Sequence, residues 1–228
     1  MNAITLLALA IAPGIAIAVL IYVKDKFDRE PKKLLIISFA LGMISILPAI
    51  VAEALSGVQN FDTSSLELTA FYSFGIIGIA EEGSKFIMLR FYAYPKKAFN
   101  EPFDGITYSV MVSMGFATVE NILYAFQFGI GNTIVRMFTA VPAHATFAIV
   151  MGYYAGLAKF SGAEAKYLFR GVIYAALLHG AYDFFLLQQY IPGMTFGALV
   201  SLYFGLRFSR KAIRSGLKES PFRNMSGE

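Results

Sequence analysis

The stretch LTAFYSFGIIGIAEEGSKFIMLRFYAY (residues 68–94) is long enough and apolar enough to cross a lipid bilayer, yet it carries two adjacent glutamates and a lysine. A hydrocarbon core about 30 Å thick requires roughly 20 mostly apolar residues in a helix. A charged side chain at mid-membrane costs roughly 2.5–3.5 kcal/mol on insertion scales. The stretch therefore predicts a membrane helix whose charges serve a function.

The rest of the chain has the same apolar character. Of its 228 residues, 57% are hydrophobic and 15% are charged, and the mean hydropathy is +0.61. A soluble domain could not bury this much apolar surface, and the sequence lacks the short alternating strands of a lipid-facing barrel. We expect an all-α, polytopic membrane bundle of about seven helices, at residues 3–23, 34–55, 67–94, 103–128, 134–158, 167–190 and 194–209.

Basic residues are distributed unevenly between the predicted connections. Seventeen of the 19 lysines and arginines lie in every second connection or in the C-terminal tail: 24–33, 90–97, 159–170 and beyond 206. The other connections hold none: 56–65, 127–133 and 188–195. Because basic connections stay in the cytoplasm, the N-terminus is predicted outside and the C-terminus inside. We predict a membrane-embedded domain over 1–209 and a short basic cytoplasmic tail over 210–228, which faces anionic lipid rather than nucleic acid.

Further ionisable and polar residues occur inside the other predicted spans. The full set is Glu81, Glu82 and Lys85 in the third span, Glu120 and Asn121 in the fourth, His144 in the fifth, and His179 and Asp183 in the sixth. At about 1.5 Å per residue, these positions fall within roughly one to two helical turns of one level. The pairs Glu81/Lys85 and His179/Asp183 are spaced i,i+4, which places both members on one helix face. We therefore predict one polar site shared by four helices, slightly toward the outside, and interpret Glu53 as interfacial.

Hydrolysis of a peptide bond inside the membrane is one chemistry that needs such a site. The sequence contains no GxSG of a rhomboid-type serine protease, no HExxH of a zinc site-2 protease and no GxGD of an aspartyl protease. The chain also lacks cysteine, which excludes a cysteine nucleophile. A glutamate and histidine site remains, in which a carboxylate takes a proton from water and polar donors stabilise the oxyanion. A proton-coupled transporter or a non-catalytic membrane scaffold stays the alternative, because intramembrane Glu and His also build proton relays.

Four motifs follow one another along the chain: AEEGSKF (80–86), FDGITYSVMVSMGFATVENILY (103–124), HATFAIVMGYYAG (144–156) and LLHGAYDF (177–184). Together they resemble the PrsW family of bacterial membrane proteases, which is related to the CAAX prenyl endopeptidases and to bacteriocin-processing proteases. An N-terminal APG and the connection KDKFDREP (24–31) match the same family, so the resemblance covers nearly the whole chain. It implies a multi-pass protein of the bacterial cytoplasmic membrane that makes the site-1 cut in a single-span anti-sigma factor.

The resemblance also assigns candidate residues. Carried over by motif, the catalytic candidates are Glu81, Glu82, Glu120, His144 and His179, and the supporting candidates are Lys85, Asn121 and Asp183. Glu81 is expected to be the general base, aided by His144. His179 and Asn121 are expected to donate to the oxyanion, with Asp183 orienting His179. The five catalytic candidates could instead supply a histidine–carboxylate set to a divalent metal such as zinc, so the glutamate-only and metal-dependent mechanisms both stay open.

Overall fold

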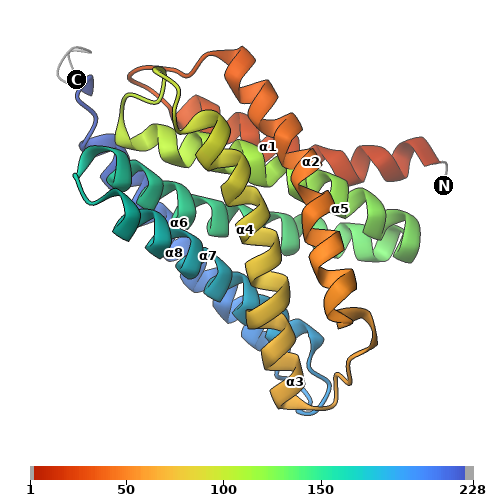
Figure 1. The fold of residues 1–228 in the computed structure, drawn as a ribbon. Coiled ribbons are helices and arrows are strands. Elements are labelled where there is room, and N and C mark those ends of the chain that lie inside the picture. Colours follow the sequence, from red (N-terminus) through yellow and green to blue (C-terminus); the bar gives the residue numbers. More distant parts are fainter. Residues whose placement is uncertain (1–2, 224–228) are drawn as a thin grey trace.

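The structure, a computed structural model, describes residues 3–223 as a bundle of helices without a strand (Figure 1). The long helices are α1 (Ala3–Lys24), α2 (Lys32–Ser56), α5 (Pro102–Phe138), α6 (Ala140–Phe160), α7 (Glu164–Leu187) and α8 (Phe196–Lys218). Shorter elements lie between α2 and α5: η1 (Val58–Asn60), α3 (Leu66–Ala70), η2 (Phe71–Ile77), α4 (Gly78–Met88) and η3 (Leu89–Ala93). The predicted all-α class is confirmed.

Three helical stretches are long and apolar enough to cross a membrane. They are Ala3–Lys24, Lys32–Ser56 and Pro102–Phe160, the last of which contains both α5 and α6. Large apolar side chains are exposed on the outer faces of the bundle, among them Ile36, Leu55, Phe91 and Phe169. Such extended apolar surface is typical of a lipid-facing protein. The count of seven spans and the orientation of the termini stay predictions.

The connections before α2, α5 and α7 lie at one end of the bundle, and those before α3 and α8 lie at another (Figure 1). At one end, Asn100 Nδ2 donates to Asp28 at 2.8 Å, which joins the connections before α2 and α5. At the other end, the amide of Gln189 donates to the carbonyl of Thr63 at 3.1 Å, which joins the α2–α3 and α7–α8 connections. Basic connections therefore lie with basic connections, as an alternating topology requires.

The predicted third span is one helical stretch over residues 66–93, and its hydrogen-bond pattern changes three times between α and π. Ser65 caps its start, because the Ser65 hydroxyl accepts from the amide of Leu68 at 3.3 Å. Two π-helical segments, η2 and η3, stand directly before and after α4, and the amide of Gly78 accordingly donates to the carbonyl of Ser73. A π-helical turn is wider than an α-helical one and rotates the helix after it. The segment η2, which directly precedes α4, thus affects the direction in which α4 presents its charged side chains.

α5 contains a break that the sequence pattern did not predict. Gly129 has φ +75° and ψ −168°, a conformation that is accessible to glycine and strained for other residues. Residues 130–138 form a further helical segment, and α6 starts only at Ala140, after a non-helical Thr139. The expected outer connection 127–133 is therefore mostly helical. The expectation of a continuous span from 134 is wrong, because the backbone turns a second time at Thr139.

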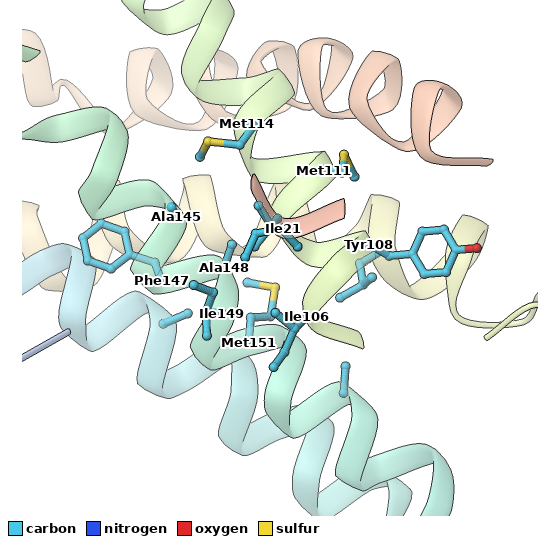
Figure 2. Packing of buried hydrophobic residues seen from close by; sticks show 14 of the residues in the cluster. Ile21, Ile106, Tyr108, Met111, Met114, Ala145, Phe147, Ala148, Ile149 and Met151 are labelled. Atoms are coloured by element: carbon cyan, nitrogen blue, oxygen red, sulfur yellow. The ribbon is translucent and has the colours of Figure 1, made fainter. Parts of the chain in front are cut away.

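The core lies where α5 and α6 meet. All residues from 103 to 118 in α5 and from 143 to 152 in α6 are buried. Figure 2 shows side chains from both helices, among them Ile106, Met114 and Met151, packed in this core. The two backbones approach so closely that a Cβ on Gly105 or Gly152 would overlap the carbonyl oxygen of the other. This close contact fixes the position of α6 relative to α5.

α8 is longer than the predicted last span. It begins at Phe196 and continues through residue 209 to Lys218, so residues 210–218 of the predicted tail are helical. Small residues form the side of α8 that packs on the bundle: Gly205, Ser209, Ala212 and Gly216. These small residues are three or four positions apart, so they lie on one face of the helix. α8 can therefore bury this face although it is rich in basic residues.

Candidate active site

α4 places Glu81, Glu82 and Lys85 in the interior of the bundle. Lys85 Nζ lies 3.2 Å from Glu81 Oε2 and 2.7 Å from Glu82 Oε1, because residues three and four positions apart flank one helix face. The Lys85 side chain is 2% exposed, so water hardly screens these contacts. The ammonium also lies 4.0 Å from the ring centre of Phe116, a cation–π distance. Lys85 therefore holds both glutamates rather than Glu81 alone.

α7 brings His179 and Asp183 to the same place. His179 Nδ1 lies 2.9 Å from Glu82 Oε1, and Nε2 lies 3.3 Å from Asp183 Oδ2 and 3.8 Å from Glu81 Oε2. The imidazole stacks on Phe147 of α6, with ring centres 4.8 Å apart and an angle of 19° between the planes. Asp183 was expected to orient His179, and the structure adds Glu82 on the opposite ring nitrogen and Phe147 on the face.

His144 of α6 connects Lys85 to Glu120 of α5. His144 Nδ1 lies 3.2 Å from Lys85 Nζ, and Nε2 lies 2.8 Å from Glu120 Oε2. Because an ammonium only donates, Nδ1 must accept, and Nε2 then carries the hydrogen that Glu120 accepts. The rings of His144 and His179 stand 5.1 Å apart and nearly perpendicular. The two histidines thus stand edge to face, His144 in contact with Lys85 and His179 in contact with Glu82.

Arg136 belongs to this network, and sequence reasoning missed it. Arg136 Nη2 lies 2.8 Å from Glu120 Oε2, and Nε donates to Asn121 Oδ1 at 3.0 Å. In an uninterrupted helix Glu120 and Arg136 would stand about 24 Å apart, at about 1.5 Å per residue. The break at Gly129 turns the chain back and brings them together. The sequence gives only one signal for Arg136: it is a single basic residue next to the predicted connection 127–133, which holds no lysine or arginine.

Asn121 has a different environment from the one expected of an oxyanion donor. Its Nδ2 donates to the backbone carbonyl of Ala10 in α1 at 2.9 Å, and its Oδ1 accepts from Arg136. The amide thereby links α1 to α5 and holds the guanidinium against Glu120. Its observed contacts support a positioning role and not donation to a reacting oxygen.

Glu53 of α2 is a further acidic residue near the site. It was interpreted as interfacial, but it is close enough to Glu120, His179 and Asp183 to interact with their charges. The side chains of Glu120 and Asp183 are 15% and 18% exposed, whereas Glu82 is fully buried. Within the network, Glu120 and Asp183 are therefore the side chains most accessible to water.

The site also has the donors that a metal ion would need. Four buried side chains bring ligand atoms to within 4.8 Å of one another: Glu81, Glu82, His144 and His179. Imidazole and carboxylate are ligands that zinc accepts, and Glu82 Oε2 is buried without a hydrogen-bond partner in the described part of the chain. The donor set thus fits a zinc-type ion. Glu120, the fifth metal candidate, is outside this set of four. Lys85 Nζ contacts three members of the set: Glu81, Glu82 and His144.

Comparison with known proteins bears on the chemistry of this site. Residues 30–208 match a family model described as PrsW family intramembrane metalloprotease. The chain is 37% identical over 211 residues to Protease PrsW of Bacillus subtilis (strain 168), which covers 91% of this chain and 95% of that protein. Protease PrsW of Clostridioides difficile (strain 630) is 38% identical over 81% of this chain and 80% of its own length. No solved structure matches the chain.

The match extends over the whole network. Residues 30–208 include every candidate residue on α4, α5, α6 and α7, and they make up more than half of the chain. The similarity to the Bacillus protein continues through nearly the full length of both chains. These matches favour a membrane-embedded peptidase over the transporter and scaffold alternatives. The chain belongs to the PrsW family of intramembrane proteases.

Proposed function

We propose that this peptidase makes the first cut in a single-span membrane protein of the anti-sigma type, near its extracytoplasmic face, with water activated by a glutamate. The observation that carries the proposal is the convergence of two glutamates, a lysine and two histidines from α4, α6 and α7 in one buried network. The predicted topology supports the side of the cut, because the polar residues lean toward the ends of the spans opposite the basic connections.

Glu81 is the general base, because it is the less constrained carboxylate of the pair. Its Oε2 lies 3.2 Å from Lys85 and 3.8 Å from His179, whereas Glu82 Oε1 contacts the same two side chains at 2.7 and 2.9 Å. The Glu81 side chain is 9% exposed and that of Glu82 is not exposed at all. Glu81 takes a proton from water as the water oxygen attacks the scissile carbonyl carbon, and the proton then passes to the leaving amine nitrogen.

His179 is the donor to the oxygen that becomes negative during the attack. Carboxylates face both of its ring nitrogens, so the ring donates on both sides only as the imidazolium. Nδ1 of His179 contacts Glu82, so the hydrogen on Nε2 is the one that points toward Glu81 and Asp183 and can reach the substrate oxygen. A preorganised donor of this kind stabilises a developing oxyanion more strongly than water does.

His144, Glu120 and Arg136 support the site from α5 and α6. His144 reaches the glutamate pair through Lys85, so its role is to position the ammonium rather than to assist Glu81 directly. Glu120 Oε2 accepts from His144 Nε2, which fixes the ring and its tautomer, and the same oxygen forms an ion pair with Arg136. Asn121 holds Arg136 in turn. These successive contacts, from Asn121 through Arg136, Glu120 and His144 to Lys85, fix the position of the Lys85 ammonium.

A divalent metal is the alternative source of activation at the same site. Its ligands would come from the buried set Glu81, Glu82, His144 and His179. When bound, such an ion supplies a Lewis acid that polarises a carbonyl and activates water. The Lys85 ammonium contacts three of these donors, so a metal ion among them would meet a like charge at short range. This contact is why we favour the glutamate mechanism.

Cleavage in proteoliposomes tests the proposal. The purified chain is reconstituted with a single-span anti-sigma-type protein, and mass spectrometry locates the new termini, with and without a strong chelator. Wild type is expected to cut near the extracytoplasmic end of the substrate span and to tolerate the chelator. Glu81→Gln and His179→Ala are expected to be inactive, and Lys166→Met, at an exposed position on α7, is expected to cut like wild type.

Each other result has a defined meaning. Activity lost with chelator and restored by zinc would contradict the glutamate mechanism in favour of the metal. A cut at the cytoplasmic end would contradict the predicted topology. Equal cleavage by Glu81→Gln and wild type would show that this network is not the site of hydrolysis.

A further inference from the structure

A second cluster of buried carboxylates lies at the end of the bundle where the basic connections gather, away from the catalytic network. Asp25 and Glu30 belong to the α1–α2 connection, Glu101 and Asp104 belong to the start of α5, and all four are buried. Asp104 precedes Glu120 by 16 positions on α5, which separates the two clusters by about 24 Å along that helix. The proposed peptidase mechanism makes no use of this second cluster.

Hydrogen bonds account for only some of its carboxylate oxygens. Asp104 Oδ2 accepts from the amides of Asn100 and Glu101 at 2.7 and 2.8 Å, as part of the capping box at the start of α5. Glu101 Oε2 accepts from the hydroxyl of Ser220, which follows α8. One carboxylate oxygen in each of Asp25, Glu101 and Asp104 is fully buried and has no partner among residues 3–223. Helix capping therefore does not explain the cluster.

The cluster also lacks a positive partner. In the part of the chain that the structure describes, no lysine or arginine nitrogen lies within ion-pair distance of the four carboxylates. Lys159 interacts with the charges of Asp104 and Glu30, but its ammonium donates to the carbonyl of Tyr94. Buried carboxylates without a counter-charge are costly, so the cluster has a deficit of positive charge.

The geometry suits a cation with oxygen ligands. Asp25, Glu101 and Asp104 each bring a carboxylate oxygen to within 4.8 Å of the others. Ligands on opposite sides of Ca²⁺ stand roughly 4.6–5.2 Å apart, and those of Mg²⁺ about 4.0–4.2 Å. We propose that these three residues, with Glu30 beside them, bind a hard divalent cation of the Ca²⁺ or Mg²⁺ type. Oxygen donors without nitrogen or sulfur favour such ions over zinc.

The bound cation has a structural consequence for the bundle. It ties the α1–α2 connection to the start of α5, and through Glu101 and Ser220 it reaches the chain after α8. Tyr108, four residues after Asp104, donates to Glu30 and extends the same junction. Because α5 also carries Glu120 and Asn121, the cation holds in place a helix that supports the active site. It acts on stability and not on the reacting atoms.

Thermal unfolding of the full chain in detergent tests this site. The protein is first stripped with a chelator, and its Tm is then measured with Ca²⁺, with Mg²⁺ and with neither. A cation concentration a hundredfold above Kd should raise the Tm by roughly 5–10 °C for a chain of this size. Terbium gives a second readout as a luminescent substitute for Ca²⁺, because the Tyr108 hydroxyl contacts Glu30 and the chain has no tryptophan.

Two variants separate this site from the catalytic network. Asp25→Asn removes one negative charge, so its Tm in chelator should equal or exceed that of wild type, while the rise with cation and the terbium signal disappear. The double variant Glu81→Gln/His179→Ala should keep both responses, because it changes only the other candidate donor set. A wild-type Tm that responds to neither cation, or a response that survives in Asp25→Asn or disappears in the double variant, would overturn the proposal.

Discussion

Replacing Lys85 with methionine removes the positive charge that the glutamate pair shares. The two contacts of 3.2 and 2.7 Å are lost, and Glu81 and Glu82 face each other as buried like charges. Removing one partner of a buried ion pair costs about 3–5 kcal/mol, because the remaining charge has no compensation. For a chain of 228 residues this corresponds to a fall in Tm of roughly 6–20 °C. Cleavage should fall by about 100-fold or more, since the general base loses its fixed environment.

Far-UV circular dichroism in detergent measures the Tm, and cleavage of a single-span substrate measures the activity. Lys166→Met is the matched control, because Lys166 is exposed on α7 and its loss should change the stability by less than about 0.5 kcal/mol. Adding Glu82→Gln to Lys85→Met removes the repulsion and should restore part of the stability but not the activity. Equal Tm values for Lys85→Met and wild type, or a zinc-dependent rescue of Lys85→Met, would refute the role of the ammonium.

Three further substitutions test how the bundle positions the site. Arg136→Gln should destabilise the protein by about 1–3 kcal/mol and slow cleavage, because Glu120 loses its ion-pair partner and Asn121 Oδ1 loses its donor. Arg136→Lys should recover part of both in kinetic and unfolding assays. Gly129→Ala should cost about 1–2 kcal/mol in thermal unfolding, because alanine is strained at φ +75°. Gly152→Ala should cost about 1–3 kcal/mol or more, because its Cβ would overlap the α5 backbone. Gly131→Ala is the control for both glycines, because a Cβ there meets open space, and equal losses at Gly131 would contradict both arguments.

The part of the site that local spacing determines could be predicted from the sequence. Glu81 and Lys85 are one helical turn apart, so their contact follows from the helix alone. His179 and Asp183 follow the same rule. The meeting of α4, α6 and α7 also follows from the sequence, because an ionisable side chain in an apolar span must face the interior or water.

The part that depends on a single backbone break could not be predicted. Arg136 reaches Glu120 only because Gly129 turns the chain, and the two glycines of the 127–133 connection do not reveal from the sequence which of them turns or in which direction. The partners of Asn121 depend on how closely α1 packs on α5, which spacing along the chain does not reveal.

The last predicted span was too short for a related physical reason. Hydropathy falls where arginine and lysine enter α8, although one face of small residues stays buried to Gly216. Hydropathy averaged over consecutive residues includes both faces of a helix. The average therefore falls where the exposed face becomes polar, even though the buried face continues. The predicted limit at 209 marks that change in composition, and the helix itself ends at Lys218.

The single-turnover rate of peptide-bond cleavage by Glu81→Gln is the decisive test of Glu81 as the general base. The substitution keeps the shape of the side chain and removes its ability to take a proton. If Glu81 is the general base, the rate should be at least about 100-fold below wild type with unchanged substrate binding. Glu67→Gln, an exposed position on the same helical stretch, should retain the wild-type rate. A Glu81→Gln protein that cleaves as fast as wild type would contradict the assignment of Glu81 as the base.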